Sequence, residues 1–88
     1  MDGPLPSGAT TLSAVPVGGR AVVRALHVDE GLVRWLRAVG VFEGQGVTVL
    51  RRGAFGGPMH VRVDSGGEFA IDRALAAGLE VSEDEARG

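Results

Sequence analysis

The second half of the chain alternates apolar and polar side chains in three short stretches, which glycine-rich segments separate. The stretches run from Val47 to Arg52, from Met59 to Asp64 and from Glu68 to Asp72. A period of two residues is typical of strands that bury one face. The segments between them, 53–58 and 65–67, carry glycines that can adopt the positive φ values of tight hairpin loops. The pattern predicts three antiparallel strands joined by two hairpins.

A strand and a short helix are expected ahead of these hairpins. Residues 20–26 alternate in the same way, with Val23 on the inward face. Asp29 then stands where a helix N-cap belongs, because its carboxylate can accept from free amides one turn on. Apolar residues recur at i, i+3, i+4 and i+7, on one helix face: Leu32, Trp35, Leu36 and Val39. Gly40 supplies the left-handed position at which such a helix ends.

The remaining segments complete a mainly β fold. Residues 73–78 predict one helical or 3₁₀ turn, and residues 79–81 predict a last brief strand. About five short strands, with one short helix inserted after the first, indicate a small closed barrel, because closure removes exposed strand edges. We expect the folded domain to span residues 14–81. A flexible lead-in rich in Gly, Pro and Ser (1–13) and an acidic flexible tail (82–88) are expected to flank it.

Composition restricts the chain to one small globular domain. Eighty-eight residues support a single core, and 44% hydrophobic residues argue against a disordered chain. The chain has no cysteine, which excludes disulfides, thiol catalysis and thiolate metal ligands. No apolar run approaches the roughly 20 residues that span a bilayer, and the start lacks the features of a secretion signal. We therefore expect a cytoplasmic protein.

The charge balance argues against nucleic acid as a partner. The net charge is −2, and residues 14–81 hold eight arginines against seven acidic residues. Five arginines on neighbouring strands could form a basic stripe: Arg20, Arg24, Arg51, Arg52 and Arg62. No aromatic residue lies among them to stack a base, so a solvated outer face is the expected interpretation. A nucleic-acid-binding barrel stays open as an alternative.

Few residues offer chemistry. His27, Asp29 and Glu30 form a local cluster that could hold a divalent cation. One imidazole and two nearby carboxylates do not complete a metal shell, and Asp29 already has a capping role. No catalytic triad or phosphate-binding loop is recognisable. We expect no enzymatic activity and no cofactor, and we keep a metal-binding or metal-sensing barrel as an alternative.

Trp35 is the one tryptophan of the chain. Its helical spacing with Leu32 and Leu36 favours a ring that seals the core. The alternative is a ring at the rim of a recognition groove, where tryptophan often dominates binding energy.

Between Ser13 and Val81 the predicted elements follow a fixed order. The helix ends at Gly40, a second glycine stands at Gly44, and then come a strand, a Gly57-Pro58 hairpin and a closing hydrophobic strand. In this order and spacing the chain resembles the FeoA family, small SH3-like barrels associated with bacterial ferrous iron transport. The matching stretches are residues 16–23, 36–49, 52–63, 69–73 and 79–81.

The resemblance implies a non-enzymatic accessory role. FeoA-like proteins are thought to bind the cytoplasmic region of FeoB, a ferrous iron transporter with a GTPase domain, and to affect its assembly or activity. The membrane would be reached only through that partner, and the chain would be a monomer or a weak homo-oligomer. Because SH3-like barrels bind through their loops, segments 29–43 and 52–59 are the expected contact regions. The candidate contacts are Phe55, Trp35, Arg34, Arg37, Phe42 and Arg52.

Phe55 is the best candidate for an anchor, because glycines flank it at a hairpin tip. The alternative is a side chain that folds back over the mouth of the barrel.

Overall fold

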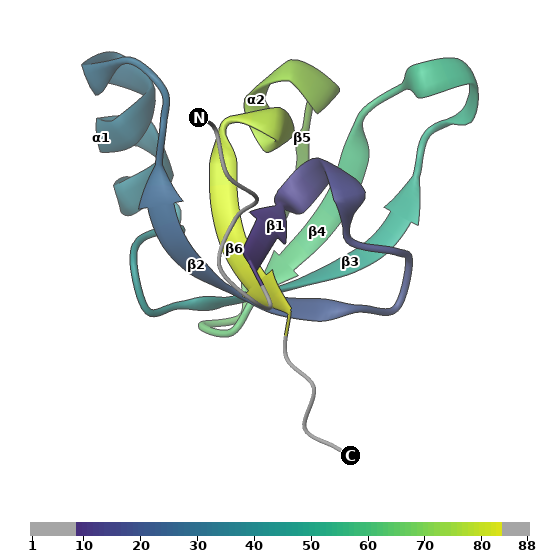
Figure 1. Ribbon diagram of the computed structural model, residues 1–88, viewed down its shortest axis with the longest axis horizontal. Coiled ribbons are helices and arrows are strands. Elements are labelled where there is room, and N and C mark those ends of the chain that lie inside the picture. The colour runs from purple at the N-terminus through teal and green to yellow at the C-terminus, as the bar shows by residue number, and fades with distance from the viewer. Residues whose placement is uncertain (1–8, 84–88) are drawn as a thin grey trace, which may run out of the picture.

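Six antiparallel strands form one curved sheet in the computed structural model, which describes residues 9–83. The elements in chain order are β1 (Ala9–Thr11), the 3₁₀ turn η1 (Leu12–Ala14), β2 (Arg20–Leu26), α1 (Glu30–Ala38), β3 (Gly46–Arg52), the 3₁₀ turn η2 (Ala54–Gly56), β4 (Met59–Val63), β5 (Glu68–Ile71), α2 (Arg73–Ala77) and β6 (Leu79–Glu83). The strand order is β1-β6-β2-β3-β4-β5, which places β6 between β1 and β2 (Figure 1). The mainly β class is confirmed.

The expected elements of the body are present. Strand β2 has the predicted bounds, and β3, β4 and β5 occupy the three alternating stretches. Helix α1 follows β2, and α2 supplies the helical turn before the last strand. Two register shifts, between Val23 and Ala25 in β2 and between Val49 and Arg51 in β3, interrupt the ladders. Such irregularities bend strands, which accounts for the curvature of a sheet built from short strands.

The folded part begins earlier than the sequence pattern predicts. Thr10 of β1 pairs with Val81, and Leu12 of η1 is fully buried, so the expected lead-in of residues 1–13 is corrected from Ala9 onward. The three residues of β1 are too few to show an alternating pattern. Their strand conformation depends on pairing with β6, which the local sequence does not show. Strand β6 runs to Glu83, into the expected tail of residues 82–88. Residues 1–8 and 84–88 lie outside the described part.

The two edges of the sheet differ from the expected closed barrel. Strands β1 and β5 stand at opposite ends of the strand order, and no ladder joins them within residues 9–83. The sheet therefore wraps around its core by curvature, with six strands in place of about five.

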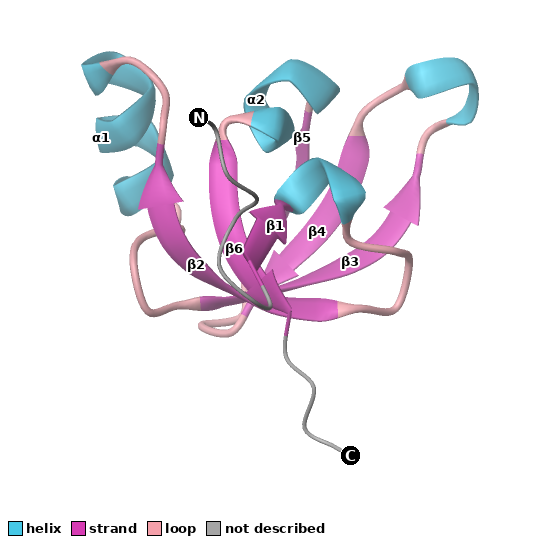
Figure 2. Ribbon diagram, viewed as in Figure 1, coloured by secondary structure: helices cyan, strands magenta, loops and turns pink. Residues whose placement is uncertain are grey.

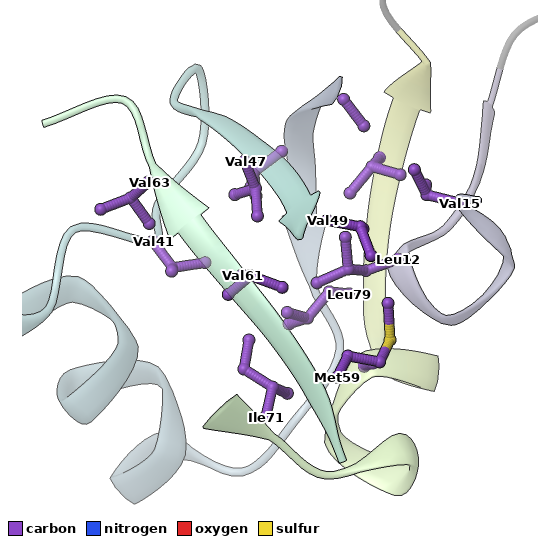
Figure 3. Close-up of a cluster of buried hydrophobic side chains, with 14 of the residues drawn as sticks. Leu12, Val15, Val41, Val47, Val49, Met59, Val61, Val63, Ile71 and Leu79 are labelled. Carbon is purple, nitrogen blue, oxygen red and sulfur yellow. The ribbon is translucent and has the colours of Figure 1, made fainter. Parts of the chain in front are cut away.

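The core is apolar throughout. Fifteen residues from the strands, η1, α1, α2 and the loops have at most 1% exposure. They are Leu12, Val15, Ala21, Val23, Leu36, Val41, Val47, Val49, Met59, Val61, Val63, Ile71, Ala76, Leu79 and Val81. Figure 3 shows how most of them pack against one another. No polar or charged side chain is buried within the described residues. Burial of β-branched side chains on one face of each strand matches the alternation of the sequence.

The helical segments gather toward one end of the curved sheet (Figure 2). Helices α1 and α2 and the turn η2 lie on this rim, and short turns connect the strands at the other end. The rim is therefore where side chains outside the sheet can form a contact surface.

Candidate functional site

Helix α1 has both of the predicted ends. The Asp29 carboxylate accepts a hydrogen bond from the backbone N–H of Leu32 at 3.0 Å, which caps the first turn. Gly40, with φ of 100°, ends the helix in the left-handed region. The N–H of Val41 then reaches back to the carbonyl of Leu36 at 2.8 Å, as in a Schellman motif, and both side chains are buried. These contacts set the length of the helix on the rim.

Trp35 does not seal the core as expected. Its side chain is 43% exposed, and Leu32, one turn earlier, is 37% exposed. Leu36 is the fully buried residue of α1. The Trp35 ring still contacts Phe69 of β5 edge-on, with ring centroids 5.8 Å apart. Helix α1 therefore buries one row of its apolar face and leaves Leu32 and Trp35 partly open to solvent.

The other candidate contacts near α1 are placed differently. Arg34 is exposed on the helix, and Arg37 is paired with Glu43 at 3.2 Å between Nη2 and Oε1. Phe42 is half-buried in the loop after the helix. Arg34 is thus the residue of this group that presents an exposed cation, because the charge of Arg37 is offset by Glu43.

The β3–β4 hairpin presents Phe55 at its tip. The side chain is fully exposed, with a relative accessibility of 106%, so it does not fold back over the barrel mouth. Phe55 adopts φ 54° and ψ 43°, the single positive φ of a non-glycine residue in the described part. This left-handed conformation is uncommon for an aromatic residue.

Arg52 is committed to the fold. Its Nη2 donates to the carbonyl oxygen of Ser13 at 2.9 Å and to that of Val15 at 2.5 Å. These bonds tie the end of β3 to η1 and to the residue that follows it. Arg52 therefore holds two loops together, a role that the sequence does not reveal because 37 or more residues separate the partners.

The two expected contact regions do not form one compact site. Helix α1 and the turn η2 lie at opposite sides of the rim, with α2 between them (Figure 1). Arg73, the first residue of α2, was not among the candidate contacts, yet its guanidinium lies next to Gly56 in the hairpin. A Cβ atom added to Gly56 would be only 3.1 Å from Nη1 of Arg73. The pairing of Met59 with Ile71 brings the start of α2 beside the hairpin. Arg73 is recognised as a neighbour of the hairpin only from this pairing of strands, which the sequence pattern does not reveal.

The residues of the predicted metal cluster, His27, Asp29 and Glu30, do not converge on one point, because two of them make other contacts. Nε2 of His27 lies 3.0 Å from Oε1 of Glu80 on β6, and Asp29 caps α1. Within residues 9–83, no group of three or more His, Asp or Glu side chains is placed to hold a metal ion. The geometry does not favour the metal-binding alternative.

The basic stripe is largely compensated. Arg20 forms an ion pair with Asp64, and its Nε donates to Oδ1 of that residue at 3.2 Å. Arg62 stands opposite Glu68 in the β4–β5 ladder, and Arg52 is bonded to backbone carbonyls. The stripe does not offer the row of unpaired cations that a phosphate backbone needs. Across the described part of the chain no pocket is present, and neither helix is long and apolar enough to cross a membrane.

Comparison with known proteins identifies relatives of this fold. The family model described as the FeoA domain matches residues 10–83. A search of curated proteins finds no match.

Solved structures give the same result. The FeoA protein of Chlorobium tepidum is 27% identical with a TM-score of 0.79, over 89% of this chain and 76% of its own. The zinc complex of FeoA from Stenotrophomonas maltophilia, described as a prokaryotic SH3 domain protein, is 29% identical with a TM-score of 0.69, over 89% of this chain and 99% of its own. A manganese-dependent transcriptional repressor is 27% identical with a TM-score of 0.78, over 92% of this chain and 39% of its own. The SH3-like fold class is confirmed.

Proposed function

Because the chain belongs to the FeoA family, which is implicated in ferrous iron transport, we propose that it is a non-enzymatic accessory protein of bacterial ferrous iron uptake. In this role it acts on the cytoplasmic side of the membrane, binds the cytoplasmic region of the FeoB transporter and modulates its assembly or activity. The family match covers nearly all of the described residues.

The observation that carries the proposal is the exposed aromatic ring of Phe55. A fully exposed phenylalanine gains no burial energy in the isolated chain, and its left-handed backbone is unfavourable for an L-residue. Both unfavourable features are offset when the ring is buried against a partner, where aromatic residues commonly dominate the binding energy. Trp35 and Arg34 on α1 are the candidates for a second, separate contact.

The test is a titration of the full chain into the cytosolic GTPase region of FeoB from the same genome. We expect saturable binding, measured by calorimetry with and without a GTP analogue. Binding that depends on the analogue would assign the chain to one nucleotide state of the transporter. Absence of binding in both nucleotide states would refute the proposed partner region.

A further inference from the structure

The β3–β4 hairpin carries a charge opposite in sign to that of the whole chain. Between Gly44 and Val63 there is no Asp or Glu, whereas the segment holds Arg51, Arg52 and Arg62, of which Arg62 stands opposite Glu68, and the chain as a whole has a net charge of −2. Arg51 and Arg52 stand at the end of β3, directly before the loop that presents the aromatic ring.

The neighbouring helix adds a cation to the same tip. The guanidinium of Arg73 lies beside Gly56, which follows Phe55 in η2. The carboxylate next to it, Asp72, accepts from the N–H of Leu75 at 2.7 Å and so caps α2. Phe55 is therefore an exposed aromatic ring that follows Arg51 by four residues in the chain and lies next to Gly56, which the Arg73 guanidinium adjoins.

The tip is also conformationally defined. The N–H of Gly53 donates to the carbonyl of Pro58 at 2.8 Å, and the N–H of Gly57 donates to the carbonyl of Ala54 at 3.0 Å. The two arms pack so closely that a Cβ atom on Gly53 would lie 3.0 Å from the Pro58 oxygen. A rigid loop loses little entropy when it binds, so it is preorganised for one geometry.

We propose that the tip of this hairpin, with Phe55 as the inserted ring and Arg51 and Arg73 beside it, docks into an apolar pocket with a carboxylate rim on the partner protein. This inference rests on the proposed function and specifies the chemistry of the surface that the partner presents. The pocket buries the ring, and the rim carboxylates pair with the two guanidinium groups.

A protein pocket suits these observations better than a lipid surface does. A single aromatic ring supplies little apolar area for insertion into a bilayer, and the two guanidinium groups beside it are fewer than the roughly four to eight cationic residues of a typical anionic-lipid site. A fluid interface does not require a tip held in one strained conformation. A pocket of defined shape does require it, because the ring must enter at a fixed angle.

The experiment compares four variants of the full chain in titrations against the cytosolic GTPase region of FeoB. Phe55→Ala is expected to raise Kd by at least about tenfold. The double variant Arg51→Glu/Arg73→Glu is expected to raise Kd and to weaken its dependence on salt concentration. Val17→Ala, which shortens another exposed apolar side chain, and Arg24→Glu, which reverses another exposed arginine, are the matched controls and should bind as the parent chain does.

The outcomes separate this inference from the proposed function. If the parent chain binds and both hairpin variants bind equally well, the hairpin is not the contact and the inference is overturned, while the proposed function stands. If the parent chain does not bind, the proposed function fails and the inference fails with it. Sedimentation with phosphatidylcholine vesicles containing phosphatidylglycerol provides the last arm: co-sedimentation that Phe55→Ala abolishes would overturn the protein pocket in favour of a lipid surface.

Discussion

The indole ring of Trp35 meets the ring of Phe69 edge-on, with centroids 5.8 Å apart and ring planes at 72°. Phe69 stands opposite the buried Val61 in the β4–β5 ladder, so its ring lies on the inner side of the sheet. The pair therefore joins α1 to an edge strand of the sheet. Together with the buried Leu36, it attaches a helix that leaves Leu32 and Arg34 exposed to solvent.

Trp35→Ala tests how much this contact stabilises the fold. We expect a loss of about 1–2.5 kcal/mol in the free energy of unfolding, because the ring is partly exposed and the edge-on pair contributes about 0.5–1.5 kcal/mol beyond its buried area. A fully buried tryptophan would cost about 3–5 kcal/mol. Urea denaturation measures the difference, and Leu32→Ala, on the same face without this ring contact, is the control. A loss above 3 kcal/mol would contradict the exposed placement.

Gly40 and Gly44 form a matched pair for the effect of a left-handed backbone. Their φ values are 100° and 92°, so an alanine at either position costs about 1–2 kcal/mol through backbone strain. A Cβ atom on Gly40 would in addition lie 3.0 Å from Oγ of Ser65, whereas nothing lies within 4 Å at Gly44. Gly40→Ala should therefore destabilise more than Gly44→Ala in thermal unfolding. Equal losses for the two variants would mean that the Ser65 contact relaxes freely.

Phe55→Gly separates binding from folding. Glycine relieves the left-handed strain at this position but adds backbone entropy to the unfolded chain, so the two effects nearly cancel. We expect the free energy of unfolding to change by less than about 1 kcal/mol, because the removed ring is fully exposed. Guanidinium denaturation checks this result. A large destabilisation would show that the ring packs against the chain in solution.

Arg52→Ala is expected to destabilise the chain by about 1.5–3 kcal/mol. The substitution leaves the carbonyls of Ser13 and Val15 without their charged donor. Arg51→Ala, the neighbouring exposed arginine, should change stability by less than about 0.5 kcal/mol. Chemical denaturation of both variants measures the contrast. Similar values for the two would argue that Arg52 is free to serve as a partner contact.

Leu12→Ala tests whether the segment before Ser13 belongs to the core. The side chain is fully buried, so its truncation should cost about 2–5 kcal/mol. A flexible lead-in predicts no measurable effect. Thermal unfolding distinguishes the two, with Val17→Ala as an exposed control in the following loop.

Local patterns predict most of the elements of this fold. Strands β2, β3, β4 and β5 follow the alternation of their residues, and Asp29 and Gly40 set the ends of α1. These features depend on interactions within a few residues, which a sequence displays directly. Strand β1 escaped prediction because three residues show no period, and its pairing depends on β6, about 70 residues away.

The candidate contact residues likewise fall into those that local sequence predicts and those that only the tertiary structure reveals. The sequence by itself determined that Phe55 stands at a glycine-flanked tip, because turn chemistry is local. Only the tertiary structure decided that Trp35 is partly exposed, that Arg52 binds distant carbonyls and that Arg73 lies beside the tip. Burial and long-range contact depend on where the sheet curves, and that curvature arises from the strand register that the assembled ladders adopt.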